Sequence, residues 1–386
     1  MPRVLLLVPT ASYRAPDFVD AARSLGVELV VGSEEQPAIA GEGTQWIPID
    51  DPMHAADVIG ALDRAHGIDA VVAVDDQGAV AAAEAGARLG FPHSDPGAVA
   101  ATRDKLEMRR RLAGGEISQP RFASSADGVG YPCVVKPTGL AASRGVIRCD
   151  NPAELERAKA RIARFWDGPT IVEEYVPGVE IALEGLLDAG RLTVLAIFDK
   201  PDPLVGPYFE ETIYVTPTRL EADVVHDVER LVERGARAIG LEEGPIHAEV
   251  RVDGDRMWLI EVAARSIGGL CARTLRFGAG ISLEEVVLRH ALGMPLDELS
   301  RESSASGVMM LPIPRGGTLR AVEGREAALS VRGVVGIEIT IPIGHRVEPL
   351  PEGDRYLGFV FARATSPEAV ESALRAAAEK LDIVIS

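Results

Sequence analysis

The first 95 residues alternate short apolar runs with helical patterns, and this alternation limits the folds that the chain can adopt. Apolar runs of this kind, separated by helices, are typical of parallel strands that are buried on both faces. We expect strands at 3–8, 27–33 and 69–75, with helices at 13–26, 53–66 and 77–89. The sequence therefore predicts a small parallel α/β layer at the N-terminus.

The turn after the first strand argues against a dinucleotide site. It reads Pro-Thr-Ala-Ser-Tyr-Arg over residues 9–14 and lacks the G-x-G-x-x-G pattern. The chain has no G-x-x-x-x-G-K-[ST] motif either. A phosphate site would therefore have to be built from other elements.

Composition restricts the partners that the protein can have. Its 386 residues are 47% hydrophobic and 25% charged, which is typical of a soluble globular protein of two or three domains. The net charge is −18 without a long basic run, so neither nucleic acid nor a membrane surface is an expected partner. Cys133, Cys149 and Cys271 have no paired spacing, which favours core thiols in a cytoplasmic protein.

A predicted β-hairpin places two carboxylates opposite each other. Apolar runs flank the turn signal at 253–255, with Glu249 on one strand and Glu261 on the other. Such a pair repels unless a cation lies between the groups, and a hard divalent cation is the natural candidate. Arg265 adds a fixed positive charge nearby. His247 shares a face with Glu249 by strand alternation, and acts either beside the metal, as a base, or as a hydrogen-bonded structural histidine.

Two lysines and a loop of small residues are candidates for phosphate binding. Lys105 lies in a basic helical segment, for which a solvated helix face is the alternative. Lys136 ends a strand, and the loop from Gly139 to Gly145, which includes Ser143, follows it. Backbone N–H groups in such a loop can approach phosphate oxygens, because glycine admits positive φ and has no side chain. A plain hairpin turn explains the loop equally well.

Residues 169–184 combine an apolar strand, an acidic pair, a Pro-Gly turn and a second strand. The segment Glu173-Glu-Tyr-Val is a candidate adenine contact, with backbone groups of Glu174 to Val176 beside the base. Glu180 is placed to accept hydrogen bonds from ribose hydroxyls. A surface hairpin without a ligand explains the same composition, so the order of the whole motif set has to discriminate.

A proline-rich loop at 199–217 is long enough to form the rim of a substrate site. Glu210 and Glu211 close this loop before the next strand. Glu211 is the candidate partner of a substrate ammonium group, and two solvated carboxylates are the alternative.

These motifs resemble, in their order along the chain, the ATP-grasp superfamily of carboxylate–amine ligases. The segments 245–252 and 260–269 look most like those of L-amino-acid ligases, which make dipeptides or similar amides. The resemblance implies an α/β chain with the ATP-grasp fold. Its expected parts are an N-terminal parallel α/β domain at 1–95, a small lobe with the glycine-rich loop at 96–180, a large lobe with the metal hairpin at 181–300, and a separate α+β lobe at 301–386. Residues 97–114 are expected to be helical.

The resemblance also implies ATP and Mg²⁺, with Mn²⁺ as a substitute, and roles for the candidate residues. Lys105 and Lys136 would bind the α- and β-phosphates, and the 139–145 loop would cover the β- and γ-phosphates. Mg²⁺ on Glu249 and Glu261 would bridge the phosphates. Arg265 would stabilise the transferring phosphoryl group and the acyl phosphate.

Two departures from the family pattern matter. Ala263 replaces the asparagine that commonly helps to hold a second Mg²⁺, which leaves the metal count open, and the glycine loop has Ser143-Arg144 where a lysine is common. The expected activity is the ATP-dependent joining of an amino acid, or a related carboxylate, to an amine, in an enzyme expected to be a homodimer. The alternatives are a nucleotide-biosynthetic ligase or carboxylase, for which Arg273 and Arg276 are the surplus basic residues, and a non-catalytic ATP-binding module.

Overall fold

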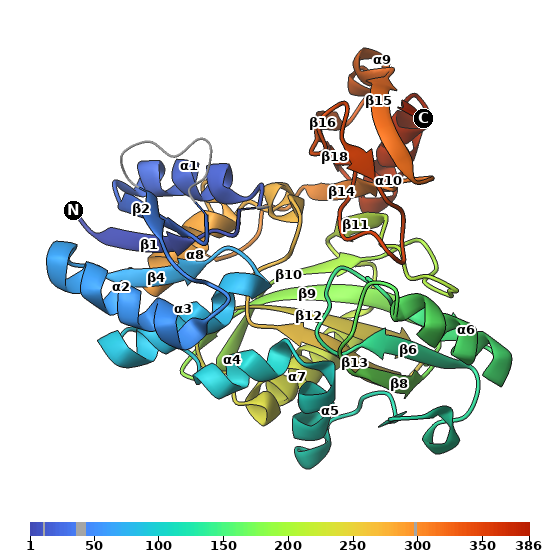
Figure 1. The fold of residues 1–386 in the computed structure, drawn as a ribbon. Helices are drawn as coiled ribbons and strands as arrows, with labels where there is room; N and C mark the ends of the chain where they lie inside the picture. The colour runs from blue at the N-terminus through green and yellow to red at the C-terminus, as the bar shows by residue number, and fades with distance from the viewer. Residues whose placement is uncertain (11, 36–43, 297–298) are drawn as a thin grey trace.

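The N-terminal region is a parallel sheet with helices on both faces. The computed structural model describes residues 1–10, 12–35, 44–296 and 299–386, and Figure 1 shows their arrangement. The strand order is β3-β2-β1-β4. Alternate residues of β1 pack against α1 and α8 on one face and against α2 and α3 on the other, as predicted for a strand buried on both sides. The elements are β1 (Arg3–Leu7), α1 (Ala15–Leu25), β2 (Glu28–Ser33), β3 (Thr44–Trp46), α2 (Pro52–His66), β4 (Ala70–Ala73), α3 (Asp76–Leu89) and, from later in the chain, α8 (Leu283–Ala291).

The segment at 97–114 is helical, as predicted, and it consists of two helices. These are α4 (Pro96–Thr102) and α5 (Lys105–Gly114). The Asp104 side chain accepts hydrogen bonds from the backbone N–H groups of Leu106 and Glu107, which starts a new helix there. The break places Lys105 at the first position of α5.

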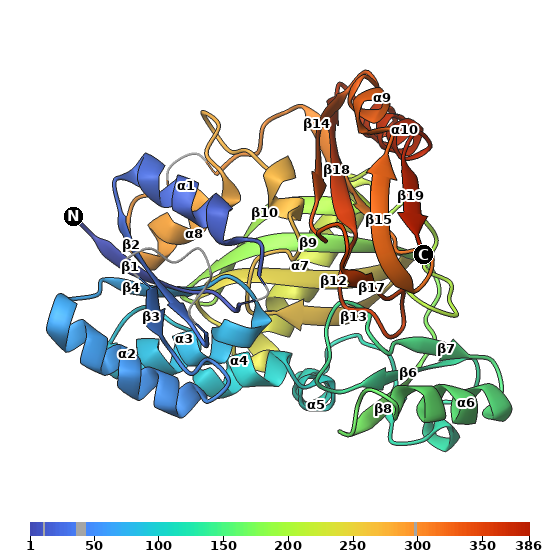
Figure 2. The same ribbon diagram turned by 45° about the horizontal axis from the view of Figure 1, so that its top comes forward.

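A small lobe follows, built on an antiparallel sheet in the order β5-β8-β6-β7. Helix α6 packs its apolar face on this sheet. Figure 2 shows the lobe below the main sheet and the C-terminal region. Its elements are β5 (Phe122–Ala123), the 3₁₀ helix η1 (Ala126–Gly128), β6 (Cys133–Pro137), β7 (Ile147–Cys149), α6 (Pro152–Ile162) and β8 (Thr170–Glu174).

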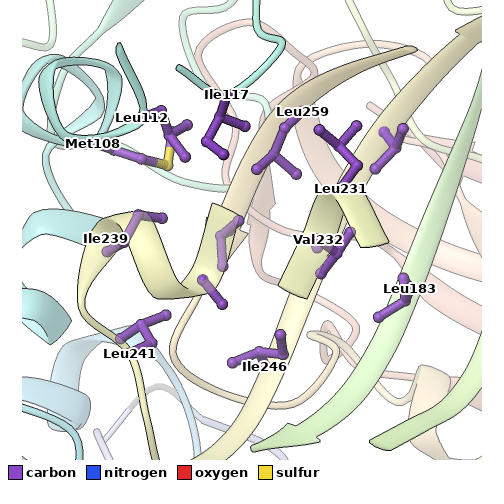
Figure 3. Packing of buried hydrophobic residues seen from close by; sticks show 14 of the residues in the cluster. Met108, Leu112, Ile117, Leu183, Leu231, Val232, Ile239, Leu241, Ile246 and Leu259 are labelled. Carbon is purple, nitrogen blue, oxygen red and sulfur yellow. The ribbon is translucent and has the colours of Figure 1, made fainter. Parts of the chain in front are cut away.

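The central sheet contains the predicted hairpin. Its strand order is β13-β12-β9-β10-β11-β14-β18-β16, and Glu249 and Glu261 are partners in register between β12 and β13, as predicted. Helix α7 packs on β12 and β13 through Leu231 and Val232, which meet Leu259 and Ile246 in one buried cluster (Figure 3). The elements are β9 (Val179–Asp188), β10 (Arg191–Asp199), β11 (Ile213–Thr216), α7 (Ala222–Ile239), β12 (Gly244–Asp253) and β13 (Arg256–Ala263).

The C-terminal region shares the central sheet with the large lobe. Strand β14 pairs with β11, and β18 and β16 extend the same sheet, so a continuous hydrogen-bonded ladder crosses the boundary expected at 300. A second sheet, in the order β17-β15-β19, completes the region. The remaining elements are the 3₁₀ helix η2 (Cys271–Thr274), β14 (Ala305–Leu311), β15 (Gly317–Glu323), α9 (Arg325–Leu329), β16 (Val334–Ile339), β17 (Arg346–Val347), β18 (Gly358–Ala364), α10 (Pro367–Ala378) and β19 (Asp382–Ile385). Among the described residues, no helix has the length and apolar character needed to span a bilayer.

Candidate active site

A cavity of about 400 Å³ lies where all of these regions meet. Its walls include residues 12–14 and 75–77 from the N-terminal region, 140–143 and 173–176 from the small lobe, and 354–356 from the C-terminal region. The central sheet contributes residues from β9, β12 and β13. Most of the candidate residues from the sequence therefore line a single space.

Two buried lysines form one wall of this cavity. Lys136, at the end of β6, has its Nζ 2.7 Å from Glu173 Oε2. Lys105 Nζ donates a 2.5 Å hydrogen bond to the Leu140 carbonyl and lies 3.9 Å from Glu261 Oε2. Lys105 is only 7% exposed, so the alternative of a solvated helix face is wrong. Both ammonium groups lie beside the loop that follows β6.

The two glycines of that loop pack closely against neighbouring side chains on the side away from the cavity. A Cβ on Gly139 would lie 2.9 Å from the Trp166 ring, and one on Gly145 would lie 2.6 Å from Pro137. Neither glycine is among the cavity-lining residues, whereas residues 140–143 are. Ser143 adopts a positive φ of 55°, which turns the backbone at the cavity edge. The glycines thus allow close packing, and the residues between them form the wall.

Glu173 and Glu174, the acidic pair at the end of β8, lie in two different environments. Glu173 is 1% exposed and is bonded by Arg109 Nε at 2.7 Å as well as by Lys136. Burial opposes its charge, but the two cations hold the Glu173 pKa at about 2. Glu174 instead turns to Arg121, with its Oε2 2.6 Å from Nε of that largely exposed side chain. Glu173 therefore positions Lys136, and the Glu174 side chain is tied to the protein surface.

Arg109, which sequence reasoning missed, connects the small lobe to the hairpin of β12 and β13. It is fully buried, and its guanidinium donates to the carbonyls of Leu259 and Ile260 at 3.0 and 2.6 Å. The same group binds Glu173. In the sequence it is one of three consecutive arginines on a helix, so only the fold shows which of them is buried.

The opposed carboxylates on β12 and β13 fit a divalent cation. Glu249 and Glu261 both line the cavity, and each has a lysine near it: Lys200 Nζ is 2.9 Å from Glu249 Oε1, and Lys105 Nζ is 3.9 Å from Glu261 Oε2. Carboxylate oxygens at partly exposed positions are the ligands that Mg²⁺ prefers. Ala263 is buried opposite His247 and offers no further donor.

Lys200 is the largest omission from the sequence-based site. Its Nζ donates to Glu180 at 2.8 Å, to Glu249 at 2.9 Å and to Glu211. The carboxylate oxygens of these glutamates lie within 4.8 Å of one another, an arrangement that could hold a metal ion. The Lys200 ammonium, however, bonds to all three. Burial opposes its charge, but the three carboxylates raise the Lys200 pKa well above its ordinary value.

Both carboxylate oxygens of Glu180 therefore accept hydrogen bonds from cationic side chains. Its Oε1 accepts from Lys200, and its Oε2 accepts from Arg251 Nε at 2.8 Å. Arg251 also donates to the Val176 carbonyl at 2.8 Å. This network joins the predicted ribose-binding residue to the predicted adenine-binding segment.

Glu211 lies between the Lys200 ammonium and a group of uncharged side chains. Tyr356 donates its hydroxyl to Glu211 Oε2 at 3.3 Å. Tyr214, Cys271 and Met310 line the same cavity. Burial and the nearby Glu249 raise the Glu211 pKa to about 7, against the opposing effect of Lys200. The alternative of a freely solvated Glu211 is thus excluded by its environment.

His247 forms a buried pair with Glu184 on the neighbouring strand β9. Its Nδ1 bonds Glu184 Oε1, while Glu184 Oε2 accepts from the Ile267 backbone N–H at 2.8 Å. Burial alone would lower the His247 pKa, but Glu184 raises it to about 9. The imidazolium Nε2 lies 3.6 Å from Glu249 Oε1, on the shared face that strand alternation predicts.

A residue of the N-terminal region, Asp76, orients the Arg265 side chain. Its Nε donates to Asp76 Oδ2 at 3.0 Å, at the start of α3. Burial opposes both charges, yet their attraction raises the Arg265 pKa and lowers that of Asp76. Asp76 and Arg265 are 189 residues apart in the sequence, so no local pattern indicates this contact.

Three family models match successive parts of the chain. Residues 19–93 match the ATP-grasp N-terminal domain, residues 129–274 the ATP-grasp domain, and residues 309–386 the L-amino acid ligase C-terminal domain 2. The order of these matches agrees with the order of the regions in the fold.

Similar proteins include two curated relatives and one solved structure. Carnosine synthase 1 of Gallus gallus is 28% identical over 402 residues, covering 91% of this chain and 41% of that protein. Alanine–anticapsin ligase of Bacillus subtilis is 26% identical over 282 residues, covering 63% of this chain and 58% of that protein. The chain thus matches about half the length of these two relatives. The crystal structure of an L-amino acid ligase from Bacillus licheniformis superposes with a TM-score of 0.83 at 24% identity, covering 100% of this chain and 99% of that one.

The fold, the cavity and these matches define an ATP-grasp ligase, an enzyme that forms C–N bonds. Within that superfamily, the chain is most similar to the L-amino-acid ligase group.

Proposed function

We propose that the protein activates an amino acid, or a related carboxylate, as an acyl phosphate and joins it to an amine, releasing ADP and phosphate. The observation that carries this proposal is the position of Glu211. It lines the same cavity as the two lysines and the opposed carboxylates, with one oxygen bonded by Lys200 and the other by the Tyr356 hydroxyl. Such a carboxylate suits a substrate ammonium group.

In this proposal the cationic side of the cavity binds the nucleotide. Lys105 and Lys136 contact the α- and β-phosphates, and backbone N–H groups of residues 140–143 cover the β- and γ-phosphates. Backbone groups of residues 174–176 contact the adenine. Each Glu180 oxygen retains a second lone pair, so a ribose hydroxyl can still donate to it.

Glu249 and Glu261 would hold Mg²⁺, or Mn²⁺ in its place. The bound cation would neutralise phosphate charge during transfer. Arg265, held by Asp76, stabilises negative charge on the transferring phosphoryl group. His247 keeps a positive charge beside Glu249 and, through Glu184, fixes the backbone at Ile267.

The chemistry follows in two displacements. A carboxylate oxygen of the first substrate attacks the γ-phosphorus, and the bond from that phosphorus to the ADP oxygen breaks. The nitrogen of the second substrate, once deprotonated, attacks the acyl carbon, and phosphate leaves with the electron pair of the C–O bond. Exclusion of water protects the acyl phosphate between these steps.

The surplus arginines do not favour a phosphoribosyl substrate. Arg273 is paired with Asp17 at 3.0 Å, and Arg276 donates to the carbonyls of Arg273 and Leu275. Neither arginine is among the residues that line the cavity. A module that only senses ATP would have little use for Glu211 in its buried setting.

A pairwise screen of the standard amino acids tests the proposal. Phosphate release should require a carboxylate and an amine together, and mass spectrometry should detect the amide. Glu211→Gln should raise KM for the carboxylate substrate about tenfold, because it removes a charged partner of the ammonium group. Glu210→Gln is the matched control, since Glu210 is adjacent in sequence but is not among the residues lining this cavity. ATP turnover at the same rate without either substrate would contradict the proposal.

A further inference from the structure

A short segment of the C-terminal region, residues 351–356, contacts the loop at 139–145, here called the phosphate-covering loop after its proposed role. The Gly145 N–H donates to the Pro351 carbonyl at 2.9 Å. Arg144 Nε donates to the Glu352 carbonyl, also at 2.9 Å. The end of the loop is thus held by the backbone of a segment more than 200 residues away.

Glu352 adds an ionic contact to the small lobe. Its carboxylate accepts from both Arg161 Nε and Arg161 Nη2, the latter at 2.8 Å, in the paired geometry that suits a guanidinium. Arg161 lies on α6, which packs on the sheet that carries Lys136. Glu352 therefore bonds to the body of the small lobe, and its backbone bonds to the loop.

The other end of the same segment reaches Glu211. Tyr356 donates to Glu211 Oε2 at 3.3 Å and packs edge-on against Phe359 of β18, with ring centroids 5.9 Å apart. Asp354 and Arg355 line the cavity between the two ends. A group that binds Glu211 therefore shares this carboxylate with Tyr356 on Oε2 and with Lys200 on Oε1.

The small lobe has its own sheet, so its position over the cavity depends on contacts of this kind. We propose that residues 351–356 act as a latch, in which Glu352 is a positioning residue: an amino acid bound at Glu211 orders Tyr356, and the segment then holds the phosphate-covering loop closed. Closure would exclude water once both ligands are present. This inference rests on the proposed function, because it assumes that Glu211 binds an amino acid.

Amide hydrogen exchange on the whole protein tests the latch. In the wild type, adding a mixture of the standard amino acids to the MgADP complex should slow exchange at residues 140–145. Glu352→Gln and Tyr356→Phe should each reduce this additional slowing about fivefold, the change in an equilibrium that about 1 kcal/mol produces. Arg157→Gln is the control, because Arg157 lies on the same helix and makes only a 4.0 Å contact with Glu154.

Turnover provides a second readout. The ratio of phosphate released to amide formed should rise about fivefold in Glu352→Gln. Glu352→Gln should add nothing to Arg161→Gln, because Arg161→Gln already removes the pair with Glu352 together with the bond to the Tyr208 hydroxyl. Unchanged exchange at 140–145 and an unchanged ratio in both Glu352→Gln and Tyr356→Phe would overturn the latch. If the wild type forms no amide from any pair, the proposed function fails. If it forms amide but the amino acids do not slow exchange, only the latch fails.

Discussion

Replacing Glu173 with glutamine should destabilise the protein by about 3 kcal/mol at pH 7. The change leaves Arg109 and Lys136 buried without their carboxylate, and breaking a buried ion pair in this way costs about 3–5 kcal/mol. The pKa of Glu173, held at about 2 against an ordinary 4.5, gives about 3 kcal/mol by an independent route. The two figures are of similar size, and the lowered pKa is the net result of attraction by the two cations and the opposing effect of burial.

The stabilisation by Glu173 depends on pH in a direction that can be stated in advance. The Glu173 pKa is lowered on folding, so its stabilisation is fully present above about pH 4.5 and is lost as the pH falls towards 2. Urea unfolding of the wild type and of Glu173→Gln should therefore differ by about 3 kcal/mol at pH 7 and by about half of that near pH 3. The glutamine variant lacks this titration.

Glu174→Gln is the matched control for this measurement. Glu174 is next in the chain, but it pairs with the largely exposed Arg121, and such a pair contributes less than about 1 kcal/mol. Equal losses from the two substitutions, or a loss in Glu173→Gln that does not shrink with acid, would refute the reasoning.

Two further substitutions test the residues that organise the cavity. Lys200→Met removes the cation shared by Glu180, Glu211 and Glu249. As a result, kcat/KM should fall at least about a hundredfold, and the surface change Lys159→Met serves as the control. Turnover near the wild-type rate would show that the three carboxylates need no fixed cation. Asp76→Asn should lower kcat about tenfold with little change in KM for ATP, because Arg265 loses its charged partner; a rise in KM alone would assign Arg265 to ground-state binding.

The sequence predicted those parts of the site that depend on local patterns. The turn at 253–255 and the alternation of its flanking strands were enough to place Glu249 opposite Glu261 and His247 beside Glu249. The two lysines and the loop after β6 were identified by their order along the chain.

The missing residues depend on contacts between distant segments. Lys200 directly follows β10, at the start of a proline-rich loop, and only the pairing of β9 with both β10 and β12 brings it to Glu180 and Glu249. In the sequence, Asp76 is recognisable only as a residue at the start of a helix. Its contact with Arg265 forms because the N-terminal region packs near that arginine. Composition and periodicity carry no information about such pairings.

The sheet shared by the large lobe and the C-terminal region is another pairing that local patterns do not show. Strands β14, β18 and β16 extend the central sheet through β11. Strand order is a property of the whole chain, so the local pattern near residue 300 carries no information about this ladder.

Oxygen-18 transfer tests the central claim of an acyl phosphate most directly. The substrate carboxylate is labelled with oxygen-18, amide synthesis is allowed to proceed with ATP, and the released phosphate is analysed by mass spectrometry. The account predicts one labelled oxygen in each phosphate, because the carboxylate oxygen that attacks the γ-phosphorus leaves with it. Unlabelled phosphate, or label in AMP, would contradict it.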